Sequence, residues 1–143
     1  MLCPQPGVTL IDSKESTPGF VLFAPGGGKQ VYLVDYNGTV VHQWQSGGGL
    51  THWCYLLPNG NLFVNERCEQ PQGVALTSSG LMREYDRHGN LVHELLDPWQ
   101  HHDARRLDNG NTVYLAYTEL NAAQRAKIKR WCSGYGNRSR YCR

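Results

Sequence analysis

The stretch Gln100–Asn111 reads QHHDARRLDNGN, so two adjacent histidines, an aspartate and two arginines precede an Asn-Gly-Asn turn. The earlier stretch Leu50–Asn61 reads LTHWCYLLPNGN and has the same frame at an offset of 50 residues. In this alignment His52 coincides with His102. A fixed period of this size is typical of a repeat architecture.

A second pair of segments repeats at nearly the same distance. Asp35–His42 (DYNGTVVH) matches Asp86–His93 (DRHGNLVH) at an offset of 51 residues. Glycine after Asn or after Asp-x-x supplies the positive φ that tight hairpin turns need. The flanking runs are short and rich in Val, Leu, Tyr, Phe and Thr, which predicts antiparallel strands. The predicted strands are Phe20–Ala24, Val31–Val34, Val40–Trp44, His52–Leu57, Asn61–Glu66, Met82–Asp86, Leu91–Leu95, His101–Arg106 and Thr112–Tyr117. About four short strands per 50 residues is typical of one blade of a β-propeller.

Only one helix is predicted, Ala122–Lys129. Asn121 can cap its first turn, and Gln124 follows three residues later in a capping-box arrangement. The sequence therefore predicts an all-β fold with this short helix near the C-terminus. Three regions follow from it: 1–120 with about two and a half four-stranded blades, the helix at 121–129, and an irregular basic tail at 130–143.

Composition excludes several classes of protein. Of the 143 residues, 40% are hydrophobic and 18% are charged, which is neither the balance of a disordered chain nor that of a membrane-spanning one. No apolar run has the length of a transmembrane helix. The residues after Met1 have no basic and no apolar region, so we expect no signal peptide in this chain.

The cysteines give no metal or redox motif. Their number is five, and no Cys-x-x-Cys occurs, which argues against a zinc knuckle or a thioredoxin-like site. Cys54 lies in a predicted strand and reads as a small hydrophobic residue. A disulfide between Cys54 and Cys68 across a hairpin and two free thiols are both compatible with the sequence.

Charge is distributed unevenly along the chain. Residues 1–120 contain seven Lys or Arg and twelve Asp or Glu, whereas residues 121–143 contain seven Lys or Arg and no acid. A basic tail can contact nucleic acid or a membrane. Nothing else in the sequence supports either partner, so we expect neither.

Four places in the chain resemble the N-terminal part of the bacterial arylsulfate sulfotransferase family. One departure from the family pattern is Asp108, where the family more often has Pro. The resembling segments are Gly7–Asp12 with Pro18–Phe23, Val31–Asp35 with Gly38–Trp44, Tyr55–Asn61, and Gln100–Asp103 with Leu107 and Asn109–Asn111.

The resemblance implies a β-propeller whose central channel holds the active site. In that family several histidines and an arginine bind the sulfuryl group, and one histidine accepts it covalently. By resemblance His102, or His101 as the adjacent alternative, is the catalytic channel histidine, with a supporting role in sulfuryl binding or acid–base work. His52 has a substrate-binding role. The nucleophilic histidine of the family belongs to a later blade and has no match here. No cofactor, metal or nucleotide donor is implied.

These residue types suit the chemistry, and each also has a plainer interpretation. A neutral imidazole can carry a sulfuryl group and pass it to a phenol, and cationic groups stabilise the oxygens of that group. For His52 a structural role is weighted equally with a substrate-binding role. The cluster from His101 to Asp103 could also ligate a metal. Arg105 and Arg106 have two interpretations, anion binding or a solvated position on an outer face, and the solvated position is favoured. The other histidines, His42, His88 and His93, are expected at surface, packing or turn positions.

The functional hypothesis is a fragment of an arylsulfate sulfotransferase-like enzyme that moves a sulfuryl group from a phenolic sulfate ester to a phenol. We expect the chain to be inactive by itself. The alternative is a non-catalytic β-propeller binding or scaffold module. A part-ring exposes strand edges, so self-association is a further expectation. Family members are often exported, but the compartment of this chain stays open.

The tail 130–143 loses the periodicity of the rest of the chain. Read one base later, its codon junctions can spell a Gly-Gly-x-Pro-Gly loop of the kind that the family has in this region. The hypothesis for this tail is therefore a frameshift product that forms no blade strand.

Overall fold

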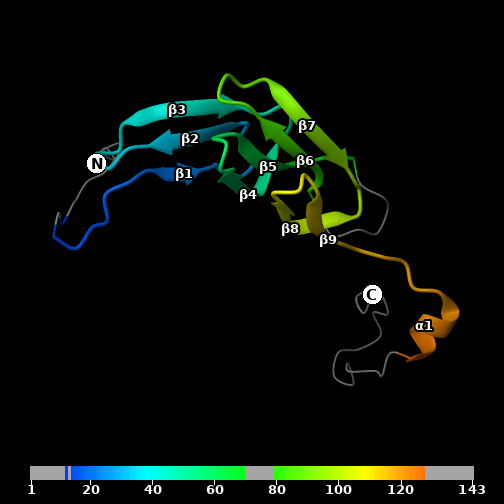
Figure 1. Ribbon diagram of the computed structural model, residues 1–143. Coiled ribbons are helices and arrows are strands. Elements are labelled where there is room, and N and C mark those ends of the chain that lie inside the picture. Colours follow the sequence, from blue (N-terminus) through cyan, green and yellow to red (C-terminus); the bar gives the residue numbers. More distant parts are fainter. Residues whose placement is uncertain (1–11, 13, 70–78, 128–143) are drawn as a thin grey trace, which may run out of the picture.

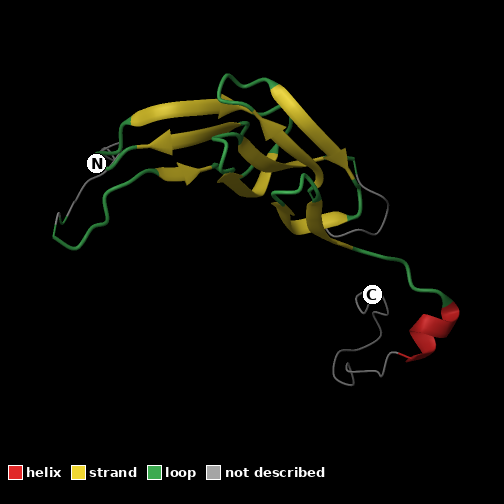
Figure 2. Ribbon diagram, viewed as in Figure 1, coloured by secondary structure: helices red, strands yellow, loops and turns green. Residues whose placement is uncertain are grey.

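The chain folds into antiparallel β-structure with one short helix (Figures 1 and 2). The computed structural model describes residues 12, 14–69 and 79–127, and describes only the backbone of residues 50–52 and 125–127. Three sheets have the strand orders β1-β2-β3, β4-β5-β6-β7 and β8-β9, and none of them is closed. The elements are β1 (Val21–Phe23), β2 (Gln30–Val34), β3 (Val40–Gln45), β4 (Leu50–Leu56), β5 (Leu62–Arg67), β6 (Gly80–Tyr85), β7 (Leu91–Leu96), β8 (Gln100–Arg106), β9 (Thr112–Ala116) and α1 (Ala122–Lys127).

The all-β prediction is confirmed, and every predicted strand is present with ends within two residues of the expected ones. The capping box of α1 is confirmed as well. The Asn121 N–H donates to Gln124 Oε1 and the Gln124 N–H donates to Asn121 Oδ1, both at 2.9 Å. In Figure 1 α1 stands apart from the sheets. The predicted end of this helix at Lys129 and the tail 130–143 lie outside the described residues. Among the described helices, none has the length and apolar character to cross a membrane.

The sequence repeat is also a repeat of strand register. The β4–β5 hairpin and the β8–β9 hairpin align at the offset of 50 residues, pair by pair and including one irregularity. The matched pairs are Leu50↔Glu66 with Gln100↔Ala116, Cys54↔Val64 with Ala104↔Tyr114, Tyr55↔Phe63 with Arg105↔Val113, and Leu56↔Leu62 with Arg106↔Thr112. Three residues in the first strand of each hairpin therefore face one residue in the second.

The second offset, of 51 residues, relates the outer hairpins. Leu33 pairs with His42 in β2–β3, as Glu84 pairs with His93 in β6–β7. Their turns are alike: the carboxylate Oδ1 of Asp35 accepts from the N–H groups of Asn37 and Thr39. One repeat later, Asp86 Oδ1 accepts in the same way from the N–H groups of His88 and Asn90. The first sheet thus corresponds to β5–β7, and the third to β4–β5.

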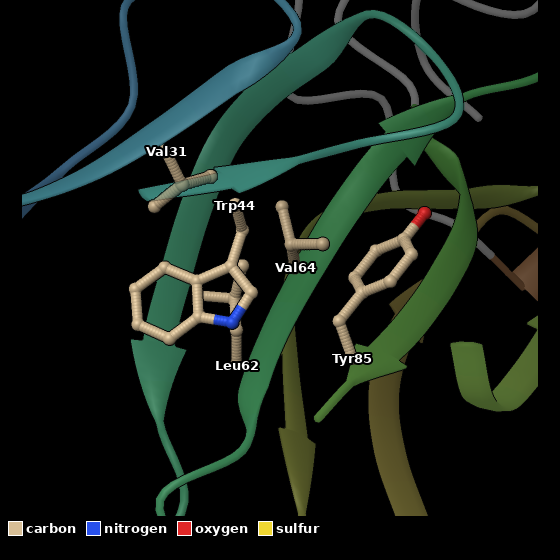
Figure 3. Close-up of a cluster of buried hydrophobic side chains, with 5 residues drawn as sticks. All are labelled: Val31, Trp44, Leu62, Val64 and Tyr85. Carbon is tan, nitrogen blue, oxygen red and sulfur yellow. The ribbon is translucent and has the colours of Figure 1, made fainter. Parts of the chain in front are cut away.

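The first two sheets pack through one buried cluster, drawn in Figure 3. Val31 of β2 and Trp44 of β3 lie against side chains of the second sheet, and the Trp44 indole donates to the backbone oxygen of Asp86 at 2.9 Å. Each such buried apolar side chain contributes about 1.5–3 kcal/mol to folding. The buried members are Val31, Trp44, Leu62, Val64 and Tyr85, with Leu22, Ala24, Leu33 and Cys54 partly buried around them.

The second and third sheets pack through a cluster of the same kind. Its buried members are Phe63, Met82 and Ala104, with Tyr55, Leu57, Leu95 and Tyr114 packed around them. Met82 and Leu95 occupy the positions of Val31 and Trp44, at the offset of 51 residues. We call the face that carries Met82 and Leu95 in the second sheet, and Val31 and Trp44 in the first, the front face. The opposite face, which carries Leu62 and Val64 in the second sheet, is the back face. In both contacts a front face lies on the back face of the next sheet.

The back face of the second sheet also contains a buried ionic network. Glu66, fully buried, accepts from Arg83 Nη1 and from the Tyr85 hydroxyl, both at 2.7 Å. Arg83 also reaches Glu94 at 2.8 Å. Burial opposes the charge of the guanidinium, but the hydrogen bond to Glu94 and the charge of Glu66 outweigh it and raise the pKa of Arg83 above its usual value. A Cβ on Gly47 would lie 2.6 Å from Arg83 Nη1, so a larger residue there would displace the guanidinium from this position.

Cys54 and Cys68 are both free. The sequence left a disulfide between them as one of two options, and the structure has the other. Burial raises the pKa of both thiols above the ordinary value. Neither thiol is therefore poised as a thiolate nucleophile.

Candidate functional site

The candidate site is built on the irregularity in β8. His101, His102 and Asp103 lie between the register pairs Gln100↔Ala116 and Ala104↔Tyr114, so three residues face Leu115 alone. His102 adopts a φ of 56°, the only positive value at a non-glycine residue in the described part of the chain. Histidine tolerates this region better than most residues, but the conformation still needs support from its surroundings. The irregularity turns the exposed His102 side chain out of the regular alternation of the strand.

Two buried amide side chains hold the backbone of this segment. Asn65 Nδ2, from β5 of the neighbouring sheet, donates to the His102 backbone oxygen at 3.0 Å. Gln100 is fully buried; its Oε1 accepts from the Gly80 N–H at 2.9 Å and its Nε2 lies 3.4 Å from the Asp103 backbone oxygen. The two histidines are thus presented from a fixed support that spans the second and third sheets.

The imidazoles of His101 and His102 meet directly. Their Nδ1 atoms are 3.0 Å apart, with the rings nearly perpendicular at 86°. His101 also lies against the Tyr117 ring, with centroids 4.2 Å apart. In this contact one Nδ1 must donate a hydrogen bond and the other must accept it, so the two imidazoles cannot both be protonated while it is made. Partial burial, and then the charge of His102, lower the pKa of His101 below its ordinary value. His101 is therefore neutral at neutral pH, as a nucleophile or base requires.

Arg105, three residues after His102 in β8, lies against aromatic side chains of β4. The Arg105 guanidinium carbon lies 4.7 Å from the Trp53 ring centroid and 4.8 Å from that of Tyr55, both residues of β4. Arg105 Nη1 is 3.9 Å from Asp103 Oδ1, an oxygen that is shielded from solvent and has no hydrogen-bond partner in the described residues. Arg105 is exposed, so its charge is accessible to an anion.

Arg106 differs from the prediction. A solvated position was favoured for it, but it is half-buried and its Nε lies 3.4 Å from Glu84 Oε2. Its backbone N–H donates to the Tyr55 hydroxyl at 2.6 Å. Glu84 sits on the front face at the position that Leu33 has in the first sheet, so an ion pair here stands beside apolar contacts. Arg106 and Glu84 belong to different sheets and meet only because the third sheet packs on the second.

His52 is placed by its backbone alone. It lies in β4 between the pairs Leu50↔Glu66 and Cys54↔Val64, the repeat equivalent of the position of His102. β4 and β8 are edge strands of their sheets and contact each other. The side chain of His52 lies outside the described part of the structure, so its distance from His102 stays a prediction.

The remaining histidines lie away from this site, as the sequence favoured. His42 and His93 are half-buried on the outer strands β3 and β7, and His42 packs edge-on against Trp44 at 4.2 Å. His88 is exposed in a turn beside Arg87. Among residues 12, 14–69 and 79–127, no three His, Cys, Asp or Glu side chains are grouped so that they could hold a metal ion.

Sequence reasoning singled out the histidines but not the residues that support them. Asn65 and Tyr117 lie in no motif, and Gln100 lies in the quoted segment Gln100–Asp103 but had no role assigned to it, because the roles of all three depend on cross-strand neighbours. Trp53 and Tyr55 could have been noticed as aromatic residues in the repeat of the site strand. Comparison with known proteins finds no matching family model, no matching curated protein and no matching solved structure.

Proposed function

We propose that the three sheets are consecutive blades of a β-propeller and that the chain is part of an arylsulfate sulfotransferase-like enzyme. The repeat supports the propeller: the same hairpins recur with the same register, and front faces lie on back faces in both sheet contacts. In this arrangement β4 and β8 are the innermost strands and line the channel.

The observation that carries the function is the His101–His102 pair in the same strand as the accessible guanidinium of Arg105. An aryl sulfate offers one negative charge on three oxygens and an aromatic ring. Arg105 and His102 are placed to attract the sulfate, and Trp53 can pack against the ring. His101, kept neutral, can accept the phenol proton that His102 passes on through the Nδ1 contact.

In the proposed reaction a histidine nitrogen attacks sulfur while the sulfur–oxygen bond to the donor phenol breaks. The leaving phenolate takes a proton, the acceptor phenol gives one up and attacks the same sulfur, and the nitrogen–sulfur bond then breaks. The family resemblance assigns the nucleophile to a later blade, so His102, His101 and His52 have supporting roles. The chain alone is then a binder of aryl sulfate and does not turn it over.

Titration with 4-nitrophenyl sulfate, followed through the imidazole NMR signals of the chain, tests this proposal. We expect saturable shifts of the His101 and His102 signals, loss of binding in His102→Asn, and no effect of the matched control His88→Asn. Release of 4-nitrophenol to an added phenol should stay at background. No shift at millimolar ligand would contradict the binding role, and turnover that disappears in His102→Asn would contradict the supporting one.

A non-catalytic propeller module is the second candidate, and one observation favours it. Both outer sheets present exposed apolar side chains, among them Val21 and Val113, which suit a protein contact better than a sulfate site. A chain that binds no aryl sulfate but associates through these faces would belong to this class.

A further inference from the structure

Two faces of the sheets are not covered by any described residues of the chain. The back face of the first sheet carries Val21, Phe23 and Val34, and the front face of the third sheet carries Val113 and Leu115. Each front face within the chain otherwise lies on a back face, as the two buried clusters show. The uncovered faces are therefore one of each kind.

Repeat equivalents show that these faces have the composition of an interior. Val113 is 57% exposed, whereas Phe63, at the same position of the second sheet, is 0% exposed. Val21 is 60% exposed, whereas its equivalent Leu62 is 0% exposed. Exposed apolar surface of this kind, over neighbouring strands, marks an interaction site more often than an ordinary solvated surface.

We propose that a second copy of this chain covers both faces: the front face of β8–β9 in one copy lies on the back face of β1–β3 in the other. The contact is of the front-on-back kind that the chain already makes twice, with Val113 at the position of Phe63 and Arg105 at that of Tyr55. The back face of β1–β3 is also hollowed beside Phe20, Val21, Phe23 and Val34, with a volume of about 540 Å³. The hollow gives the aliphatic side chains Val113 and Leu115 a place to enter.

The number of blades in a propeller favours an assembly of two copies. The contact joins two different surfaces, and such contacts close into rings when the rotation allows it. Propellers contain about 4–8 blades. Two copies supply six sheets around a two-fold axis, whereas three copies supply nine. The closed form is thus a dimer in which each copy gives one front and one back face.

This inference rests on the blade arrangement of the proposed function but not on sulfotransferase chemistry. Its test is association in the absence of any sulfate, so a failure of sulfate binding leaves it standing. The reverse also holds, since a monomeric chain can still bind an aryl sulfate.

Sedimentation velocity of the full chain at micromolar concentrations measures the assembly. We expect a dimer of the 16.1 kDa chain, and we expect Val113→Glu and Phe23→Glu each to weaken it by about 100-fold, because each places a carboxylate among the apolar side chains of the contact. Mixing the two variants should restore a dimer fraction, because one wild-type front face then meets one wild-type back face. Val92→Glu, at an equally exposed valine of β7 in the covered second sheet, is the matched control and should remain dimeric.

Three results would overturn the proposal. The first is a monomer at every concentration, and the second is assemblies that grow beyond two copies. The third is a mixture of Val113→Glu and Phe23→Glu that stays monomeric, or either variant dimerising alone, as like-on-like contacts would allow. Circular dichroism spectra and melting of the variants, which alter exposed side chains, establish that the folds are intact; if Val113→Glu does not fold, Leu115→Glu takes its place on the same face.

Discussion

The second sheet and its two neighbours are built from the same repeat, yet their side chains have opposite environments. In the second sheet, β5 is buried on both faces, with Leu62 and Val64 against the first sheet and Phe63 against the third. The equivalent strands β1 and β9 have the same register and similar side chains, but one face of each is exposed. Local sequence therefore determines strands and turns, whereas burial depends on what lies next to the sheet. Stability should concentrate in the second sheet.

The largest test of this comparison is a matched pair of truncations, Phe63→Ala and Val113→Ala. Phe63→Ala should lower the free energy of unfolding by about 3–5 kcal/mol, because it opens a cavity in the buried cluster. Val113→Ala, at the equivalent exposed position, should change it by less than about 0.5 kcal/mol. Urea unfolding followed by tryptophan fluorescence, at a concentration where the chain is monomeric, measures both. Equal effects would mean that the two sheets are covered alike.

The ionic network offers a second contrast, between the buried partner of Arg83, Glu66, and its exposed partner, Glu94. Arg83→Met removes the cation from the fully buried Glu66 and should cost about 3–5 kcal/mol, since a buried charge is left without its partner. Glu94→Gln removes the exposed partner of the same arginine and should cost less than about 1 kcal/mol. The midpoints of urea unfolding compare the two. A mild effect of Arg83→Met would show that water reaches Glu66.

These contrasts show which parts of the fold the sequence could predict. Strand positions and turns came from the Asn-Gly and Asp-x-x-Gly patterns, and the cap of α1 came from Asn121 and Gln124, because these are interactions between residues close in the chain. The period of 50 residues correctly aligned the two hairpins that contain His52 and His102. Local chemistry and repetition were sufficient for all of these.

The site itself was only partly predictable. The left-handed conformation of His102 and its support by Asn65 come from three residues facing one across the hairpin, and no periodicity of side chains reports that number. The burial of Arg106 depends on Glu84 in another sheet, so the expectation of a solvated side chain was wrong. Both features depend on packing between segments that are distant in the sequence.

A third pair of variants should have equal effects, because it changes turns, whose energy depends on local structure, and not side chains whose burial differs between the sheets. Gly60 and Gly110 end equivalent turns with φ near 84° and 83°, and an added Cβ would meet nothing within 4 Å at either. Each Gly→Ala change should therefore cost about 1–2 kcal/mol from backbone strain alone. Thermal or urea unfolding should give equal losses in the second and third sheets. Unequal losses would mean that the turn energy depends on the neighbouring sheet.

The smallest effect concerns the two irregular strands, which share a backbone but not a chemistry. At the position of His101 in β8, β4 has Thr51, so only the third sheet brings two imidazoles together.

Burial and the charge of His102 lower the pKa of His101 in the folded chain. The unfolded chain, with an ordinary histidine pKa of about 6.5, then binds the proton more readily than the folded one. Protonation therefore opposes folding: this stability is fully present above about pH 6.5 and is lost as the pH falls from there through the lower pKa of the folded state. NMR titration of the His101 ring should give a midpoint below about 6.5, and His102→Asn should raise it, because a neutral amide replaces the neighbouring charge. Thr51→Ser, a change in the matching position of β4, should leave the midpoint unchanged. A midpoint that is unaffected by His102→Asn would mean that burial alone lowers the pKa and that the two rings do not share a proton.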